Sequence, residues 1–218
     1  MEQAQAITDA VFTHMCGFVK PGMTEKEVEA ELIAVLYRGG SDGLAFPPIV
    51  VAGPNSSMPH GVAGYRVIRE GDFLTMDFGA KYQGYCSDMT RTVAIGYATD
   101  KMKEIYDTVL QAQLAGIAAT REGVCGCEVD AAARQVIADA GYGSYFGHGY
   151  GHGLGIQVHE GPNCNPSGKT PLPVGAVCSA EPGIYLPGEF GVRIEDVVVV
   201  TADGCKNITR SPKELIIL

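Results

Sequence analysis

Basic residues are scarce in this sequence, and no stretch of it concentrates them. The chain has 16 Lys and Arg against 25 Asp and Glu, for a formal net charge of −9. Proteins that bind nucleic acid present clustered Lys and Arg to the phosphates, and this chain has no such cluster. We therefore expect no nucleic-acid partner.

Long apolar runs and C-x-x-C cysteine pairs are also lacking. No segment reaches the eighteen or so apolar residues that a membrane span requires, and residues 1–18 lack the basic and then apolar pattern of a signal peptide. The 7 cysteines are scattered and include no C-x-x-C pair. We expect reduced, mostly buried thiols, a cytoplasmic location and no membrane partner.

The order of predicted elements repeats along the chain. Thr24 and Glu27 form the capping box that begins the second helix. The predicted helices cover 2–19, 25–38, 100–119 and 128–140, and the predicted strands cover 47–51, 72–80, 85–96, 156–159, 176–186 and 191–201. Each half is helix, helix, short strand and long hairpin. We expect one α+β domain over residues 1–218, with helices covering a curved antiparallel sheet.

A glycine-rich segment, GHGYGHGLGIQVHEGP, holds three of the 5 histidines. His148 and His152 have the spacing of one helical turn, but each interior glycine costs a helix about 1 kcal/mol relative to alanine. The glycines also do not fit a phosphate-binding loop. We predict a turn that enters a short strand over 156–159.

Each long hairpin carries two acids, Asp77 and Asp88 in the first and Glu181 and Glu195 in the second. Buried carboxylates without compensation are costly, so positive charge must lie beside them. Ion pairs with Arg91 and Arg193 are one interpretation, and a site for two divalent ions is the other. Four acids near a histidine-rich turn favour the metal site, and its oxygen-rich ligands favour Mn²⁺, Co²⁺ or Fe²⁺. Two such ions that share a water suit hydrolysis.

Four motifs carry a resemblance to a known family. They are DFGA(x)Y(x)2Y(x)SD(x)TRT at Asp77–Thr92, GHG(x)G(x)3HE(x)P at Gly151–Pro162, EPGIY at Glu181–Tyr185 and GVRIED at Gly191–Asp196. Together they resemble the M24 metallopeptidases, which include prolidase, aminopeptidase P and methionine aminopeptidase. The resemblance implies the duplicated pita-bread fold of the creatinase and aminopeptidase type. It also implies two divalent ions, Mn²⁺ or Co²⁺ ahead of Fe²⁺ or Zn²⁺, and a metal-bridging water or hydroxide that attacks the peptide.

The resemblance further implies roles for individual residues. The implied metal ligands are Asp77, Asp88, His152, Glu181 and Glu195, with Asp88 and Glu195 bridging both ions. Glu181 and three histidines form the implied catalytic group: His159 at the scissile carbonyl, His60 near the leaving group, and His148. Arg193 is expected to brace the site or to bind a substrate carboxylate. Tyr85 is expected either in the core or beside the pocket.

His148 favours the prolidase and aminopeptidase P branch, so we predict hydrolysis of Xaa-Pro bonds in small peptides. The length of the chain leaves methionine aminopeptidase as the main alternative. Carbon–nitrogen hydrolases of the creatinase type and a non-catalytic peptide-binding module are further alternatives. Members of the proline-specific branch usually carry an additional N-terminal domain. Homodimer formation and restriction to dipeptides therefore stay open.

Overall fold

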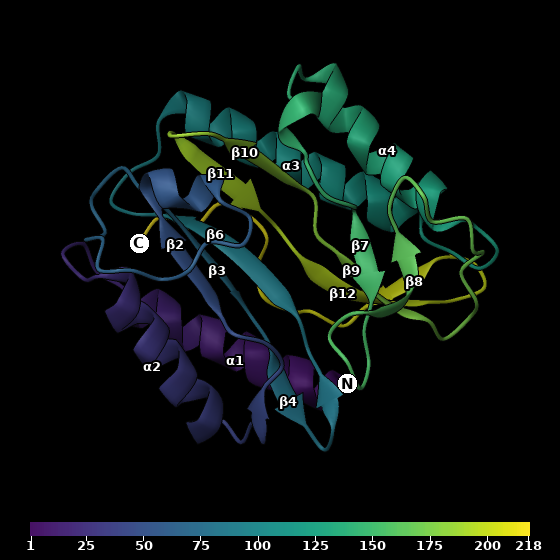
Figure 1. Ribbon diagram of the computed structural model, residues 1–218, viewed down its shortest axis with the longest axis horizontal. Coiled ribbons are helices and arrows are strands. Elements are labelled where there is room, and N and C mark those ends of the chain that lie inside the picture. Colours follow the sequence, from purple (N-terminus) through teal and green to yellow (C-terminus); the bar gives the residue numbers. More distant parts are fainter.

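The computed structural model describes residues 1–218 as two halves, each with a pair of helices packed on antiparallel strands (Figure 1). The helices are α1 (Glu2–Phe18), α2 (Glu25–Arg38), α3 (Asp100–Ala119) and α4 (Gly126–Asp139), with 3-10 turns η1 (Gly53–Ser57) and η2 (Gly143–Tyr145). In Figure 1, α1 and α2 lie along one side of the strands and α3 and α4 along the other. None of the helices is both long enough and apolar enough to cross a membrane.

The strands form four separate antiparallel ladders. Those of the first half are β1 (Gly43–Leu44), β2 (Ile49–Ala52), β3 (Phe73–Phe78), β4 (Ala80–Tyr82), β5 (Tyr85–Cys86) and β6 (Met89–Ala94). Those of the second half are β7 (Gly151–Gly153), β8 (Glu160–Cys164), β9 (Val177–Ala180), β10 (Gly183–Leu186), β11 (Phe190–Arg193), β12 (Asp196–Val200) and β13 (Cys205–Asn207). The ladders have the orders β2-β3-β6, β1-β4-β5, β10-β11 and β13-β12-β9-β7-β8. The predicted antiparallel architecture is confirmed, but the one expected sheet is divided.

Helix ends follow their capping residues. At α2 the capping box of Thr24 and Glu27 is present, as predicted. At α4 the Glu128 carboxylate accepts a hydrogen bond from the backbone N–H of Cys125 at 3.0 Å. This cap begins α4 at Gly126, two residues before the predicted start.

All four long predicted strands are interrupted, and three of the interruptions coincide with an acid. Asp88 lies between β5 and β6, Glu181 between β9 and β10, and Glu195 between β11 and β12. Asp77 is the exception, because it lies within β3, one residue before the strand ends. A residue at a break leaves the regular alternation of a strand, so its side chain is not bound to one face of the sheet. The breaks thus allow acids from different ladders to reach a common place.

The predicted strand over 156–159 is wrong, and the strand of the glycine-rich segment is β7, which carries His152 at its centre. β7 pairs with β8 on one side and β9 on the other. A Cβ at Gly151 would lie 2.1 Å from the Ser179 carbonyl oxygen, and a Cβ at Gly153 would lie 2.3 Å from that of Gly161. Glycine therefore lets the neighbouring chain segments approach closely enough to fix His152.

Two hydrophobic cores lie on either side of the central strands. One holds 22 buried residues under α3 and α4, and the other holds 18 under α1 and α2. In α2, Val28, Leu32 and Leu36 are each fully buried. Because each half has its own packed core, the strands between them form a rigid support for the polar groups where the halves meet.

Substituting Gly151 by alanine should destabilise the protein, because its Cβ would collide with backbone that cannot move freely. We expect Gly151→Ala to lower the free energy of unfolding by about 1–3 kcal/mol, as for other overpacked sites, measured by urea unfolding. Gly147→Ala is the matched control, because nothing lies within 4 Å of a Cβ at that position. Equal stability of the two variants would contradict this account of β7.

Candidate active site

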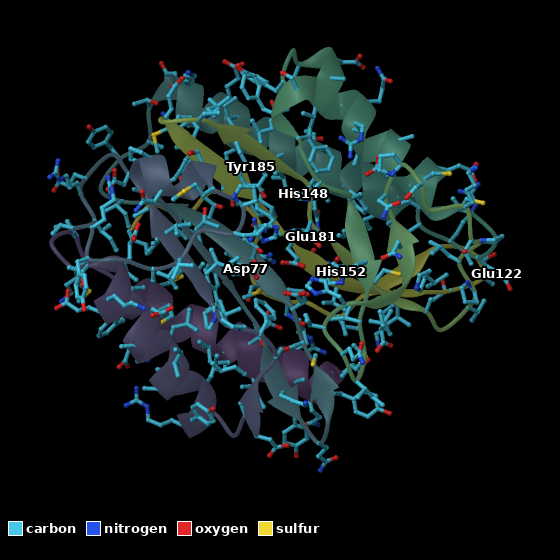
Figure 2. The ribbon with its side chains drawn as sticks, viewed as in Figure 1. Asp77, Glu122, His148, His152, Glu181 and Tyr185 are labelled. Carbon is cyan, nitrogen blue, oxygen red and sulfur yellow. The ribbon has the colours of Figure 1, made fainter.

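A cavity of about 300 Å³ lies where the two halves meet, and acids and histidines dominate its wall. Figure 2 shows Asp77, His148, His152, Glu181 and Tyr185 gathered there, whereas Glu122 lies at the edge of the molecule. The predicted site residues that line the cavity are His60, Asp77, Asp88, His148, His152, His159, Glu181, Arg193 and Glu195. The structure thus brings together every predicted site residue except Tyr85.

The centre of the cavity is a group of acids around the His152 imidazole. Asp88, His152 and Glu195 each offer one ligand atom, and these three atoms lie within 4.8 Å of one another. The His152 Nε2 atom is 3.1 Å from Glu181 Oε1 and 3.6 Å from Asp88 Oδ2. Such a spacing allows several donor atoms to contact one cation.

The ring of His152 is oriented by its own strand. Its Nδ1 lies 3.1 Å from the Gly153 carbonyl oxygen, which can only accept, so Nδ1 carries a proton and Nε2 faces the acids. The backbone N–H of His152 donates to Ser179 Oγ at 2.9 Å, and that hydroxyl donates to Glu181 Oε1 at 3.0 Å. A backbone carbonyl that fixes the outer nitrogen is the usual second partner of a metal-binding histidine.

Two carboxylate oxygens in the group have no partner. Asp77 Oδ1 and Glu195 Oε1 are buried and accept no hydrogen bond. Burial, reinforced by the neighbouring carboxylates, raises the pKa values of Asp88 and Glu195 well above the ordinary range. Orphaned buried oxygens and acids that resist ionisation both indicate positive charge that the protein itself does not supply.

His152 and Glu181 shift in opposite directions as a hydrogen-bonded pair. Burial disfavours the charge on each, but the hydrogen bond and attraction between them outweigh it. The pKa of His152 rises to about 9 and that of Glu181 falls to about 2. Without a metal, His152 is therefore an imidazolium at neutral pH.

Ion pairs with arginine account for one of the four acids. Arg193 Nη2 donates to Asp77 Oδ2 in a buried pair. Arg91 instead pairs with Asp196 at 2.8 Å, and it contacts Glu195 at the backbone carbonyl and not at the carboxylate. The alternative that two ion pairs neutralise the group is therefore wrong in its larger part.

Arg193 fixes the proton arrangement on His148 through Tyr185. Arg193 Nη1 donates to the Tyr185 hydroxyl at 2.8 Å, and that hydroxyl lies 2.9 Å from His148 Nε2. The His148 Nδ1 atom lies 2.8 Å from the Gly149 carbonyl oxygen and must donate to it. Tyr185 then donates to an unprotonated Nε2. Burial lowers the pKa of His148, in agreement with a neutral ring whose two nitrogens are both engaged.

Sequence reasoning missed the polar groups that hold these residues. Thr90 Oγ1 accepts from Arg193 Nε at 2.9 Å and donates to Glu195 Oε2 at 2.7 Å. Tyr185 and Ser179 have the contacts described above. Thr90 and Tyr185 stand inside the motifs quoted for the acids, and Ser179 stands two residues before Glu181, so closeness to an acid was the available signal.

The remaining predicted residues differ in their placement. The His159 and His60 rings are exposed at the cavity, and the His159 ring centroid is 4.3 Å from that of His152. Tyr85 does not line the cavity and does not belong to the core, since it is 46% exposed. It lies at the β4–β5 turn, where the hairpin reaches solvent. Both alternatives for Tyr85 are therefore wrong.

A cavity of this kind, with carboxylates around one oriented imidazole, defines a candidate centre for divalent metal ions. The model of metallopeptidase family M24 matches residues 1–202. The chain belongs to metallopeptidase family M24, as the motifs predicted.

Relatives with solved structures confirm the pita-bread fold. The chain is 50% identical to a Xaa-Pro dipeptidase from Bacillus anthracis, with a TM-score of 0.98, and covers 61% of that chain and 100% of its own. It is 50% identical over 218 residues to the uncharacterized peptidase YqhT of Bacillus subtilis. It is 41% identical, over 99% of its length, to a Xaa-Pro dipeptidase of Pyrococcus horikoshii. It spans 62% of each of these two curated relatives.

In protein freed of metal by chelation, His152 should stabilise the fold at low pH and lose this effect at high pH. Its folded pKa of about 9 lies above the ordinary value of 6.5, so the contribution is complete below about pH 6.5 and disappears as the pH rises through 9. Urea unfolding of the wild type and of His152→Gln should therefore differ more at pH 6 than at pH 10. A difference that grows with pH would contradict the pairing.

Proposed function

We propose that this chain is the catalytic part of a dimetal peptidase that hydrolyses the N-terminal Xaa-Pro bond of small peptides. The observation that carries the proposal is the group of four carboxylates around His152, three of them buried and two with an orphaned oxygen, in an open cavity. The names of the relatives support the substrate class, since those from Bacillus anthracis and Pyrococcus horikoshii are Xaa-Pro dipeptidases. A cytoplasmic location and the formation of a homodimer remain predictions.

The residues present fit a pair of divalent cations. The proposed ligands are Asp77, Asp88, His152, Glu181 and Glu195, with Mn²⁺ or Co²⁺ ahead of Fe²⁺ or Zn²⁺ because four of the five donors are carboxylates. Bound there, divalent ions lower the pKa of water and polarise a carbonyl group. The unpartnered oxygens of Asp77 and Glu195 are free to contact the cations.

Three residues, His159, Glu181 and His60, are proposed to act on the peptide and on the attacking water. His159 lies at the rim beside His152, where its ring can donate to the scissile carbonyl oxygen. Glu181 Oε1 is held by Ser179 and His152, which leaves Oε2 to accept a proton from the attacking water.

The leaving amine is assigned to His60 and not to His148. Both nitrogens of His148 are engaged, one by Tyr185 and the other by the Gly149 carbonyl, so this ring has no proton to deliver. The His60 ring is exposed at the cavity and makes no hydrogen bond to the protein. His148, which the resemblance placed in the catalytic group, is proposed instead to form part of the cavity wall.

An Xaa-Pro bond presents a ring and no N–H after the scissile carbonyl. The apolar part of the cavity wall, formed by Phe46, Ile49 and Val158, can receive such a ring. Methionine aminopeptidase remains the alternative, because an apolar pocket also suits a methionine side chain.

Asp88→Ala should remove bound metal and activity together. A carboxylate that bridges two ions contributes to both, so we expect the metal content of the variant to fall by more than one ion per chain and hydrolysis to be lost. Elemental analysis of the purified protein and an Ala-Pro hydrolysis assay with added Mn²⁺ measure the two effects. Asp100→Ala, at a fully exposed surface position, is the control. Full hydrolysis by a chelated, metal-free sample would refute the metal-dependent mechanism.

A peptide panel distinguishes the two enzymatic functions. At equal metal loading we expect Ala-Pro and Met-Pro peptides to be cleaved and Met-Ala-Ser to be cleaved poorly, measured as kcat/KM for each peptide. If Met-Ala-Ser were cleaved at least about ten times more efficiently than the proline peptides, a difference of about 1.4 kcal/mol in transition-state binding, methionine aminopeptidase would replace the proposal.

A further inference from the structure

Asn165 lies just after β8 in the wall of the active-site cavity, and hydrogen bonds fix the orientation of its amide. Its Oδ1 accepts hydrogen bonds from the backbone N–H and the hydroxyl of Ser167, at 3.0 and 2.8 Å. Because a backbone N–H can only donate, the oxygen of the amide must face Ser167. The Nδ2 group therefore faces away from Ser167, and it donates to no protein atom. It offers two N–H groups to a ligand.

The backbone of Gly149 places this amide beside His148. A Cβ at Gly149 would lie 2.6 Å from the Asn165 Cβ, so Asn165 packs directly on the glycine. The carbonyl of Gly149 in turn holds the ring of His148. Asn165 thus belongs to the wall formed by His148 and Gly149, whereas the acids surround His152.

The cavity has few donors left for an anionic end of a substrate. Arg193 is the one guanidinium in its wall, and all three of its nitrogens bind protein oxygens. His148 is engaged at both nitrogens, and His152 faces the acids. A substrate carboxylate beside the four acids would be repelled. The donors that remain are the rings of His60 and His159 and the amides of Asn163 and Asn165. Of these, only the Asn165 side chain is oriented by hydrogen bonds.

We propose that Asn165 Nδ2 donates to the C-terminal carboxylate of an Xaa-Pro dipeptide and so selects a free carboxylate over an amide or a longer chain. This inference rests on the proposed function and deepens it, because it assigns the residue that recognises the far end of the substrate. A neutral amide can bind a carboxylate without adding a charge that would pair with the metal-binding acids. Asn165 is thereby a specificity-determining residue.

The test compares Ala-Pro with Ala-Pro-amide in Asn165→Asp and Asn165→Ala. The aspartate keeps the size of the side chain and an oxygen for Ser167, but it replaces the donor by a negative charge. We expect Asn165→Ala to lower kcat/KM for Ala-Pro by about 10-fold or more, as for loss of a hydrogen bond to a charged group. Asn165→Asp should lower it further, whereas Ala-Pro-amide should lose less than about 3-fold with either variant. Equal losses for the two peptides would overturn the proposal.

Asn163→Asp is the matched control, because it adds the same charge to another residue of the cavity wall. A loss for Ala-Pro as large as that of Asn165→Asp would show a general charge effect and would also overturn the proposal. Ligand-observed NMR of Ala-Pro and Ala-Pro-amide requires no turnover, so it separates this proposal from the proposed function. Wild-type protein should bind the free carboxylate more tightly than the amide, and Asn165→Ala should not. Absence of this preference in the wild type would refute the role of Asn165 even if Xaa-Pro bonds are hydrolysed.

Discussion

One guanidinium connects the two halves of the molecule at the point where four carboxylates meet. Arg193 ends β11 in the second half, yet it binds Asp77 on β3, Thr90 on β6 and the Pro59 carbonyl, all in the first half. Its remaining contact, to Tyr185, lies within its own half. Buried and paired on every nitrogen, it fixes how the halves are joined. Removing it would leave Asp77 as an uncompensated buried charge.

That single positive charge is too small for the acids around it, and the shortage gives the site its chemistry. Burial and mutual repulsion raise the pKa values of Asp88 and Glu195 well above the ordinary range. His152 responds by taking up a proton and pairing with Glu181. A metal ion that binds to His152 Nε2 must displace the proton on that atom, so metal affinity and pH are linked. The excess of negative charge that destabilises the metal-free protein therefore creates its affinity for divalent ions.

The sequence predicted which acids belong together but not how the chain delivers them. The acid pairs and the order of elements are visible in the sequence. The resemblance of the motifs to family M24 then led to the correct fold. Pro182 and Gly183 were a local signal for the interruption at Glu181, whereas no proline or glycine adjoins Asp88 or Glu195 to mark the other two interruptions. The strand of His152 was misplaced because glycines normally weaken strands, whereas here a close approach of Ser179 and Gly161 requires them. The hydrogen bond at His148 Nε2 could not be predicted, because its partner Tyr185 is 37 residues away in the sequence.

Arg91, the second buried arginine, pairs with Asp196 and leaves the neighbouring Glu195 carboxylate available to the metal site. Glu195 and Asp196 are neighbours in sequence, as are Thr90 and Arg91, yet each member takes a different partner. Thr90 donates to Glu195 at 2.7 Å, whereas Arg91 and Lys213 both pair with Asp196 at 2.8 Å. Thr90 and Arg91 are successive residues of β6, so their side chains point to opposite faces. Glu195 lies at the break before β12 and can reach the cavity, whereas the side chains of Arg91 and Lys213 stay beside Asp196. A shift of one residue in register would exchange the faces and would place Arg91 among the acids. The ligand group therefore depends on strand register as much as on the acids themselves.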